Sequence, residues 1–521
     1  MESYIIIFIS LCLSFLVRFI LTLLLSPSPT TTENLPPGPS TFHLLTNILW
    51  RRKSFFELGP VISTLRKKYG PIITVKMGSH ACIFISDNTL AHEALVNRGA
   101  VFADRPETTG VDLIFPVKRK GINQSRYGTR WRVLRRNLTC SSGVLHPSRI
   151  KSYSHLRERV LENLICELKH ESEFGDGDVC VYESLKHAIF SLLVLICFGN
   201  NVEENKIREL EDAQNRFCLI FRRVSNVVFA IIPNFGKILF RKSWKEFVDV
   251  IKCKENILVS LIRERKKIKQ ENEEKDIDSE CYVDTLFDLR LPGDQHKILE
   301  ESEIMNLSDE FISGGTEKMT TALQWIMANI VKYPKVQAKI LVEMKGILQK
   351  GQRCIKGKDV YKLPYLQAVI LEGLRRHPPV YLPGRPHAVT EDVELGGYRI
   401  PQGMWVNFMV ADMGRDPNAW ESPLEFKPER FSCNNNHNDN DIGVTASSRE
   451  IKMMPFGAGR RICPGLDLAI LDLEYFVANL VWKFEWNAVD DDVDLSEKVE
   501  FTITGMKKPL RARVSPRRPR D

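Results

Sequence analysis

The sequence lacks the patterns that would cross-link the chain or tie it to a nucleic acid. Its twelve cysteines form no CxxC pair and follow no regular spacing, which excludes a disulfide framework and a zinc site of the usual ligand spacing. No internal repeat is apparent. Excess charge of one sign is scarce before residue 506. The net charge of the whole chain is +8, and the residues from Met506 onward account for most of it, with seven basic residues against one acid. We therefore predict no nucleic-acid partner.

Apolar material is sufficient for a folded protein. The 521 residues are 43% hydrophobic and 26% charged, which excludes a disordered or fibrous chain. Helical periodicity dominates the middle of the sequence, as at 155–169 and 182–197. Strand-like runs are short, at 72–77, at 82–85 and in a Gly-Gly hairpin at 394–400. The pattern predicts a mostly α protein with small β-sheets.

One apolar run, from Tyr4 to Leu25, is long enough to cross a bilayer. A cleaved signal peptide is the alternative, but its apolar core usually spans only about 7 to 15 residues. Ser26-Pro27-Ser28 is followed directly by Pro29, which makes a poor cleavage site. Arg18 lies near the end of the run, where its side chain can reach the interface. We therefore predict a transmembrane anchor at 4–25.

The charges that flank this run indicate which side of the membrane the body occupies. Glu2 precedes the run, whereas basic clusters at 51–53 and 66–68 follow it, which places the body on the cytosolic side. A connector at 26–44 joins anchor and body. Its prolines at 35–39 fix φ and forbid a helix, which predicts a stiff connector, with an ordinary Pro-rich linker as the alternative.

The most informative segment is Phe456-Gly457-Ala458-Gly459-Arg460-Arg461-Ile462-Cys463-Pro464-Gly465, which an apolar helical pattern follows. A thiolate that ligates haem iron needs a lowered pKa, backbone N–H donors aimed at the sulfur, and a tight loop that lets the porphyrin approach. The glycines permit that approach, and a helix that begins after Cys463 adds a positive dipole end. A cysteine buried in the core is the alternative for a lone cysteine before a helix.

The spacing Phe-x-x-Gly-x-Arg-x-Cys-x-Gly resembles the haem-binding loop of the cytochrome P-450 superfamily, with the plant microsomal members most similar. The resemblance implies a cytochrome P-450 fold with one N-terminal transmembrane helix and a haem-thiolate catalytic domain at 45–505. It implies haem b as the cofactor and Cys463 as its axial ligand. Phe456 would pack against the sulfur side of the ring, Arg461 would approach a propionate, and Gly465 completes the loop.

A second signature supports the same family. Glu372 and Arg375 are three residues apart on one helical face, where they can form an ion pair, and His377-Pro378-Pro379 then ends the helix. A surface ion pair is the alternative. The pair resembles the buried Glu-x-x-Arg pair of the family, which is completed by an arginine in Pro-Glu-Arg-Phe, here Arg430. Such a network would support the haem loop without taking part in the chemistry.

Other residues match positions that contact the haem propionates in this family. Trp131 and Arg135 resemble the Trp-x-x-x-Arg helix, and their spacing of four puts both on one face. His387 occupies a position where another propionate contact is common, with a plain strand residue as the alternative.

The sequence departs from the family at the distal helix, whose acid and alcohol relay protons to iron-bound dioxygen. The segment at 314–325 reads Gly-Gly-Thr-Glu-Lys-Met-Thr-Thr-Ala-Leu-Gln-Trp. The glycines, the acid Glu317 and the downstream residues align without a gap. Lys318 therefore stands where the alcohol is expected.

Three interpretations of Lys318 remain open. In the first, Thr321 lies about one turn further along the same face, ordered water replaces the hydroxyl, and monooxygenation persists with reduced coupling. In the second, the protein rearranges or dehydrates an oxygenated lipid without cleaving dioxygen. In the third, catalysis is impaired because the amine pairs with Glu317 or ligates the iron. A binding or structural role without catalysis belongs to this third case.

We predict a monooxygenase of the endoplasmic reticulum membrane, with one span and a cytosolic catalytic domain. It would insert one oxygen atom from dioxygen into a hydrophobic small molecule, using electrons from an NADPH-cytochrome reductase. The anchor would contact membrane lipid. The segment 111–117 is an apolar loop expected near the pocket. Candidate contacts for the acidic reductase are basic residues near the thiolate: Arg130, Arg132, Arg136, Lys452 and Arg460.

Two further segments are expected to lie outside the core. The segment 432–450 is poor in apolar residues and predicts a surface excursion. The tail at 506–521 is basic, and it would either touch anionic headgroups or remain disordered.

Overall fold

The computed structural model describes residues 10, 14, 34–39, 58–77, 80–107, 121–175, 177–224, 233–271, 280–291, 298–348, 354–431, 450–490, 492–500 and 502–517. The predicted anchor at 4–25, apart from residues 10 and 14, lies outside this set. So do the loop at 111–117 and the segment 432–449.

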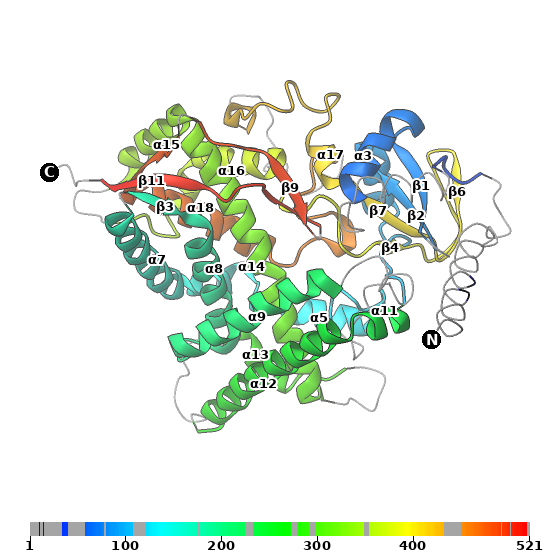
Figure 1. Ribbon diagram of the computed structural model, residues 1–521, viewed down its shortest axis with the longest axis horizontal. Helices are drawn as coiled ribbons and strands as arrows, with labels where there is room; N and C mark the ends of the chain where they lie inside the picture. The colour runs from blue at the N-terminus through cyan, green and yellow to red at the C-terminus, as the bar shows by residue number, and fades with distance from the viewer. Residues whose placement is uncertain are drawn as a thin grey trace.

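The described chain is mostly helical, as predicted (Figure 1). The α-helices are α3 (Leu58–Tyr69), α4 (Asn88–His92), α5 (Thr129–Thr139), α6 (Pro147–Ser152), α7 (Ser154–Phe174), α8 (Val181–Phe198), α9 (Glu204–Val224), α11 (Pro233–Leu239), α12 (Arg241–Glu271), α13 (Tyr282–Phe287), α14 (Glu301–Lys332), α15 (Pro334–Ile347), α16 (Pro364–Arg376), α17 (Val410–Gly414) and α18 (Leu466–Lys483). Shorter turns of helix are η2 (Glu93–Asn97), η4 (Val360–Lys362), η5 (Pro428–Phe431) and η6 (Gly459–Arg461). Both predicted helices, at 155–169 and 182–197, are confirmed as α7 and α8.

The strands are short and form small sheets. They are β1 (Ile72–Met77), β2 (His80–Ile85), β3 (Asp178–Cys180), β4 (His387–Ala388), β5 (Val393–Leu395), β6 (Tyr398–Ile400), β7 (Trp405–Phe408), β8 (Phe484–Ala488), β9 (Glu497–Glu500), β10 (Ile503–Met506) and β11 (Arg511–Pro516). The largest sheet has the order β1-β2-β7-β4. The predicted hairpin at 394–400 is confirmed as β5 and β6, and it turns at Gly396 and Gly397 with φ of 61° and 80°.

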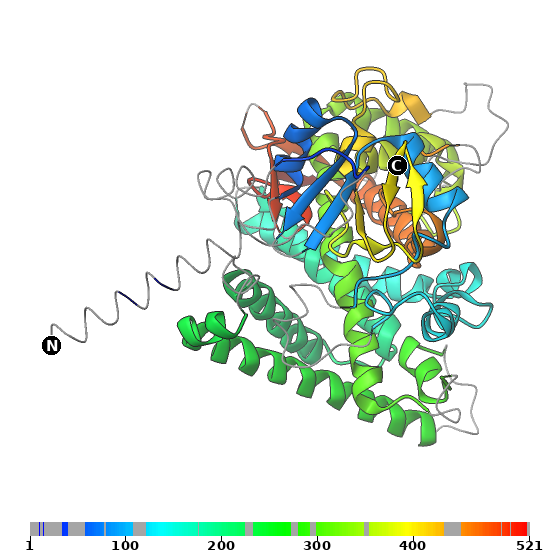
Figure 2. The same ribbon diagram turned by 90° about the vertical axis from the view of Figure 1, so that its right-hand side faces the viewer.

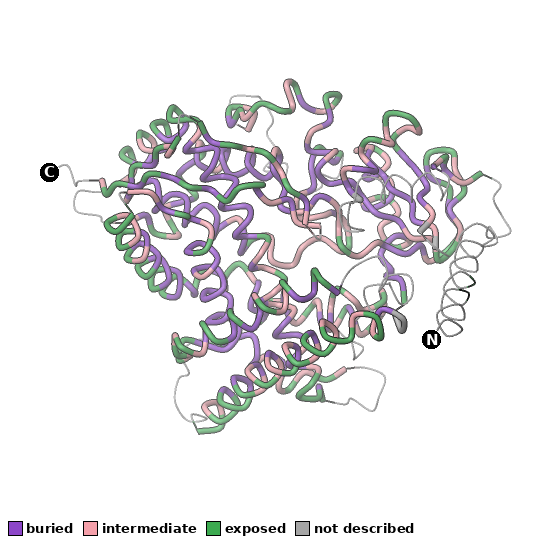
Figure 3. Tube along the Cα trace, viewed as in Figure 1, coloured by how far each residue is buried: buried purple, intermediate pink, exposed green. Residues whose placement is uncertain are grey.

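The long helix α14 organises the core. It extends from the layer formed by α9 and α12 into the body, where it contacts α8, α16 and α18 (Figures 1 and 2). The interior around these helices is buried (Figure 3). Trp325, which is 0% exposed, fixes the helix because its indole N–H donates to the carbonyl of Thr504 at 2.7 Å.

Among the described residues, the helix that is long and apolar enough to cross a membrane is α8. In the structure 83% of this helix is buried, because it packs against α7 and α14. It is therefore part of the core.

The described part of the Pro-rich connector, 34–39, is attached to the sheets. The N–H of Thr74 on β1 donates to the carbonyl of Pro37 at 3.0 Å, and the N–H of Arg399 on β6 donates to that of Asn34 at 3.0 Å. Gly38 is required at this contact, since a Cβ there would lie 1.8 Å from the carbonyl oxygen of Thr74. This stretch is therefore stiff because it is docked as well as because it is rich in proline.

Residues 506–517 belong to the fold, which corrects the expectation of a basic tail that begins at residue 506. Strand β11 pairs with β3 and β8. Leu510, Ala512 and Val514 are at most 1% exposed, whereas the basic residues that alternate with Ala512 and Val514 point outward. Composition concealed this strand because a net charge does not distinguish its two faces.

His377 follows the last turn of α16 and lies in a buried polar cluster. Its ring stacks on Trp325 at a centroid distance of 4.1 Å, and Nδ1 contacts a carboxylate oxygen of Glu497 at 3.0 Å. Burial lowers the pKa of His377 to about 4. The bond from His377 and the charge of Arg415 overcome burial and lower the pKa of Glu497 to about 2.

These two shifts predict a loss of stability in acid. Between about pH 6.5 and 4 the unfolded His377 binds a proton that the folded one does not, so the free energy of unfolding falls as pH falls. Glu497 adds a further loss from about pH 4.5 downward, as its folded pKa lies below its unfolded value. Urea unfolding should give a slope near 1.4 kcal/mol per pH unit from His377. The measured slope should fall by about this amount in His377→Gln, with the remainder coming from other buried groups such as His387. It should stay unchanged in the exposed His155→Gln, and an unchanged slope in His377→Gln contradicts the assignment.

Candidate functional site

A cavity of about 1000 Å³ lies between α14, the loop before α18 and the segment before β4. It collects residues that are far apart in the sequence. Ten of the thirteen predicted site residues line it: Trp131, Arg135, Glu317, Lys318, Thr321, His387, Phe456, Arg461, Cys463 and Gly465.

The loop that carries Cys463 is closed by its own backbone. The N–H of Cys463 donates to the carbonyl of Phe456 at 2.9 Å, and the N–H of Gly465 donates to the sulfur. Gly459 has a φ of 66°, and a Cβ there would lie 2.0 Å from the carbonyl oxygen of Leu95. Only glycine fits this turn, which holds the thiol against the cavity.

Opposing effects act on the Cys463 thiol. Burial raises its pKa, whereas the Gly465 N–H and the charges of Lys318 and Arg135 act in the opposite direction. The net shift is upward. A bound metal cation would reverse it, because coordination deprotonates a thiol.

Arg461 forms one side of a basic rim. Its guanidinium donates to the carbonyl oxygens of Ala103 at 2.7 Å and Ser125 at 2.8 Å, and it lies 4.6 Å from the ring centroid of Trp131. Burial lowers its pKa to about 10, and repulsion from Arg135 contributes. Arg461, Trp131 and Arg135, which the sequence predicted separately, therefore lie together on one side of the cavity.

Arg105 completes the rim, and the sequence did not predict it. It donates to the carbonyl oxygens of Arg385 and Pro386 at 3.1 and 3.0 Å, while its buried Nε has no hydrogen-bond partner within the described chain. Burial lowers its pKa to about 9, with repulsion from Arg461 next. Nothing in its local sequence marks it, since only the fold brings it to the cavity.

His387 lies in β4 and also lines the cavity, so the two alternatives for this residue are compatible. Its Nδ1 lies 2.6 Å from the carbonyl oxygen of Phe102, which makes it the donor. Burial, followed by the charge of Arg105, lowers the pKa of His387 well below its ordinary value. The ring is therefore neutral.

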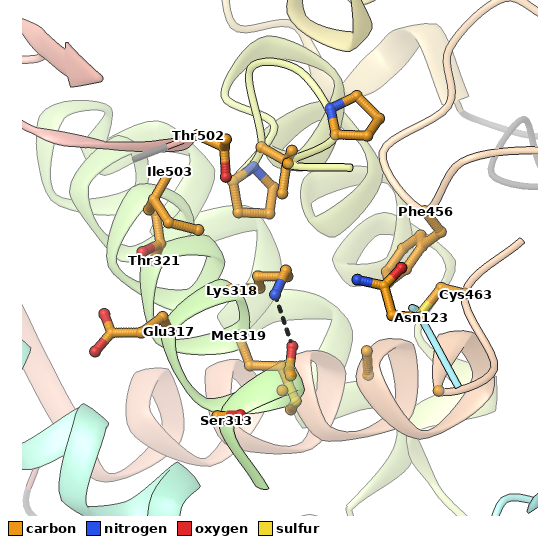
Figure 4. Close-up of a pocket in the computed structure, with 18 of the residues that line it drawn as sticks. Asn123, Ser313, Glu317, Lys318, Met319, Thr321, Phe456, Cys463, Thr502 and Ile503 are labelled. Atoms are coloured by element: carbon orange, nitrogen blue, oxygen red, sulfur yellow. Dashed lines mark hydrogen bonds between the residues drawn. The ribbon is translucent and has the colours of Figure 1, made fainter. Parts of the chain in front are cut away.

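Glu317 does not pair with Lys318. Its carboxylate accepts a hydrogen bond from the hydroxyl of Tyr182 at 3.0 Å and forms an ion pair with Lys186 at 2.9 Å. In Figure 4 it points away from Cys463. One form of the impaired-enzyme interpretation, a pair between Glu317 and Lys318, is therefore wrong.

Lys318 projects into the cavity. Its amine donates to the carbonyl of Gly314, one turn earlier, at 3.0 Å (Figure 4). The side chain has accessible surface, but protein encloses the amine, so that surface belongs to the cavity wall. Burial lowers the pKa of Lys318, although Cys463, Glu317 and Glu310 partly offset this effect. Thr321, which is 2% exposed, also lines the cavity.

Comparisons with known proteins identify the family of this chain. A family model described as Cytochrome P450 matches residues 36–513. The chain belongs to the cytochrome P450 family. It is 44% identical over 498 residues to Cytochrome P450 89A9 of Arabidopsis thaliana, covering 94% of this chain and 95% of the relative. It is 30% identical to Tabersonine 6,7-epoxidase isoform 1 of Catharanthus roseus, covering 88% and 87%.

The fold is also that of solved cytochrome P450 structures. A zebra fish cytochrome P450 solved with progesterone superposes with a TM-score of 0.71 at 22% identity, covering 88% of this chain and 99% of that one. As a cytochrome P450, the protein is an oxidoreductase of the haem-thiolate monooxygenase class. Its cofactor is haem with a cysteine thiolate as axial ligand.

Haem fits the charge pattern of the cavity in this cytochrome P450. Within the described residues, no carboxylate forms a salt bridge with Arg105, Arg135 or Arg461. Buried guanidinium groups need anionic partners, and the two propionates of haem would supply them. Cys463 would hold the iron, and Phe456 would pack against the ring.

The remaining three predicted residues form a buried network beside the cavity. Glu372 and Arg375 are both 0% exposed and are joined by two bonds, at 2.7 and 2.8 Å. Arg430 donates to the same carboxylate at 3.1 Å. Arg375 also donates to the carbonyl oxygens of Gly414 and Pro423. The arrangement links α16 to the segment 414–425 and carries no reactive group.

Proposed function

We propose that this cytochrome P450 is a membrane-anchored monooxygenase with Cys463 as the axial ligand of its haem. It inserts one oxygen atom from dioxygen into a hydrophobic small molecule. The observation that carries the proposal is the single cavity in which Cys463 faces the distal helix at Lys318 and Thr321. When bound, the haem supplies the iron at which dioxygen is activated.

Glu317 and Thr321 on the distal helix have different roles. Glu317 is held by Tyr182 and Lys186, and burial together with the charge of Glu317 raises the pKa of Tyr182. Tyr182 therefore stays a hydrogen-bond donor. Thr321 supplies the hydroxyl that remains on the cavity side, and ordered water beside it carries protons in place of the missing alcohol.

An NADPH-cytochrome reductase would supply the electrons from the side of the Cys463 loop. Arg132 and Arg460 meet there at Tyr127: the guanidinium of Arg132 lies 5.2 Å from its ring centroid, and Arg460 donates to its hydroxyl at 2.6 Å. Both arginines are exposed, which supports docking of an acidic partner. Arg136 is exposed as well. Two other predicted contacts are weaker candidates: Arg130 forms a 3.2 Å pair with Glu303 and Lys452 a 3.1 Å pair with Glu450. The anchor at 4–25 would hold the protein in the endoplasmic reticulum membrane.

The second candidate function is isomerisation or dehydration of an oxygenated lipid, which the replacement of the distal alcohol by Lys318 favours. The two functions differ in what they consume. Vesicles that hold the full chain and reductase are supplied with NADPH, labelled dioxygen and a panel of hydrophobic plant metabolites that includes tabersonine. We expect substrate-dependent NADPH oxidation and a product with one labelled oxygen. Turnover of a linoleic acid hydroperoxide without NADPH would instead support the second candidate.

A further inference from the structure

Among the described residues, every carboxylate that lines the cavity is already bound to another group. Glu310 accepts the backbone N–H groups of Ile122 and Asn123 at 2.6 and 2.7 Å. Glu317 is occupied by Tyr182 and Lys186 on α8, as described above. These acids therefore bond to the protein around the cavity. Their charges favour the charged form of Lys318, but neither forms a salt bridge with it.

The third carboxylate in the described lining is Glu500. It forms a 2.8 Å ion pair with Arg222 and a second pair with Lys498. Both basic partners line the cavity too, so this carboxylate is already shared between two cations.

Besides the arginine rim and Lys318, the described lining includes four other cations: Arg222 and Lys498, which pair with Glu500, and Arg385 and Lys507. The rim formed by Arg105, Arg135 and Arg461 suits the two propionates of haem. Lys318 is separate from these groups, because it projects from the distal helix and its amine donates to the uncharged carbonyl of Gly314. Within the part of the chain that the structure describes, Lys318 forms no salt bridge with a carboxylate. Under the proposed function the Cys463 sulfur is bound to iron and offers no free anion.

We propose that Lys318 is a specificity-determining residue that binds an anionic group, a carboxylate, of the substrate. The inference rests on the proposed function and names a substrate class for the same cavity: an apolar molecule with one acidic group. The lining of the cavity includes the apolar residues Phe217, Phe221, Leu307 and Phe311, which suits the rest of such a molecule. A carboxylate beside the amine would also favour its charged form, which burial otherwise disfavours.

The test compares two probes of equal chain length, dodecanoate and dodecanol, on the haem-loaded full chain. Affinity is measured by calorimetry and by the spectral shift on binding. We expect dodecanoate to bind the parent protein at least about 10-fold more tightly than dodecanol, the scale of one desolvated charge pair. Lys318→Met should bring the ratio to about one, and Lys318→Arg should keep it. Lys332→Met is the matched control, since Lys332 lies on the same helix outside the cavity and pairs with Asp492; it should keep the ratio.

Several results would overturn the inference. They are absence of dodecanoate binding, equal affinity of the two probes in the parent protein, or an unchanged ratio in Lys318→Met. A resting spectrum of nitrogen ligation that disappears in Lys318→Met would also overturn it, as the amine would then be bound to iron. Failure of the proposed function gives a different result: turnover or the thiolate spectrum is missing while the calorimetric ratio persists.

Discussion

Replacing Cys463 by alanine is expected to abolish the strongly red-shifted Soret band that the reduced protein should show with carbon monoxide. Turnover should fall to background in the same variant. The reason is that thiolate ligation produces both the band and the reactivity of the iron. Cys218 also lines the cavity, but the sulfur of Cys463 accepts the Gly465 N–H, and its backbone N–H donates to the Phe456 carbonyl. Spectra of the purified full chain, before and after reduction, provide the measurement.

Cys140→Ser is the matched control. Bonds from Ser142 and from the backbone lower the pKa of the Cys140 thiol, so acidity alone would favour Cys140 as the thiolate. It does not line the cavity, and its replacement should leave the carbon monoxide spectrum intact. A red-shifted band in Cys463→Ala, or its loss in Cys140→Ser, would contradict the assignment.

Where the signal is local, the sequence predicted geometry that the structure shows. The loop at 456–465 and the pair Glu372–Arg375 each fit within ten residues, so spacing alone indicates their geometry. The helices α7 and α8 were predicted for the same reason, since their periodicity extends over several turns. Strand β2 begins two residues earlier than predicted, because His80 and Ala81 pair with Met77 and Lys76 of β1.

The remaining features depend on contacts between distant segments. Arg105 reaches the rim only because the fold places residues 103 to 105 beside Arg461. The direction of Glu317 is set by Tyr182 and Lys186, which are more than 130 residues away. Strand β11 was mistaken for a tail because its partners, β3 and β8, lie elsewhere in the sequence. No local pattern could reveal these three features.

Replacing Glu372 by glutamine is expected to destabilise the fold by about 3–5 kcal/mol, because it leaves Arg375 and Arg430 buried without a countercharge. Arg375 is 0% exposed, so water cannot compensate for the lost carboxylate. Lys427 also loses a charged acceptor, since its backbone N–H donates to Glu372 at 2.8 Å. Urea unfolding of the parent and the variant gives the difference directly.

The neighbouring Glu429→Gln variant is the control. Glu429 pairs with Lys339 at 2.6 Å, but the two side chains are 54% and 57% exposed. An exposed pair contributes less than about 1 kcal/mol. Because Glu429 is exposed, the same substitution there removes a charge without leaving a buried partner. The comparison therefore separates the effect of burial from the effect of charge. Equal stability losses in Glu372→Gln and Glu429→Gln would contradict the network.

Loss of the Glu372 network should also weaken the packing of the haem loop. The guanidinium of Arg375 lies 5.2 Å from the ring centroid of Trp420, and the indole N–H of Trp420 donates to the carbonyl of Lys452 at 3.2 Å. Met453 and Phe456 pack in the same cluster. Glu372→Gln should therefore release haem at a lower urea concentration than the parent protein does. Loss of the Soret absorbance measures this release. Glu429→Gln should not, because its ion pair lies outside this chain of contacts.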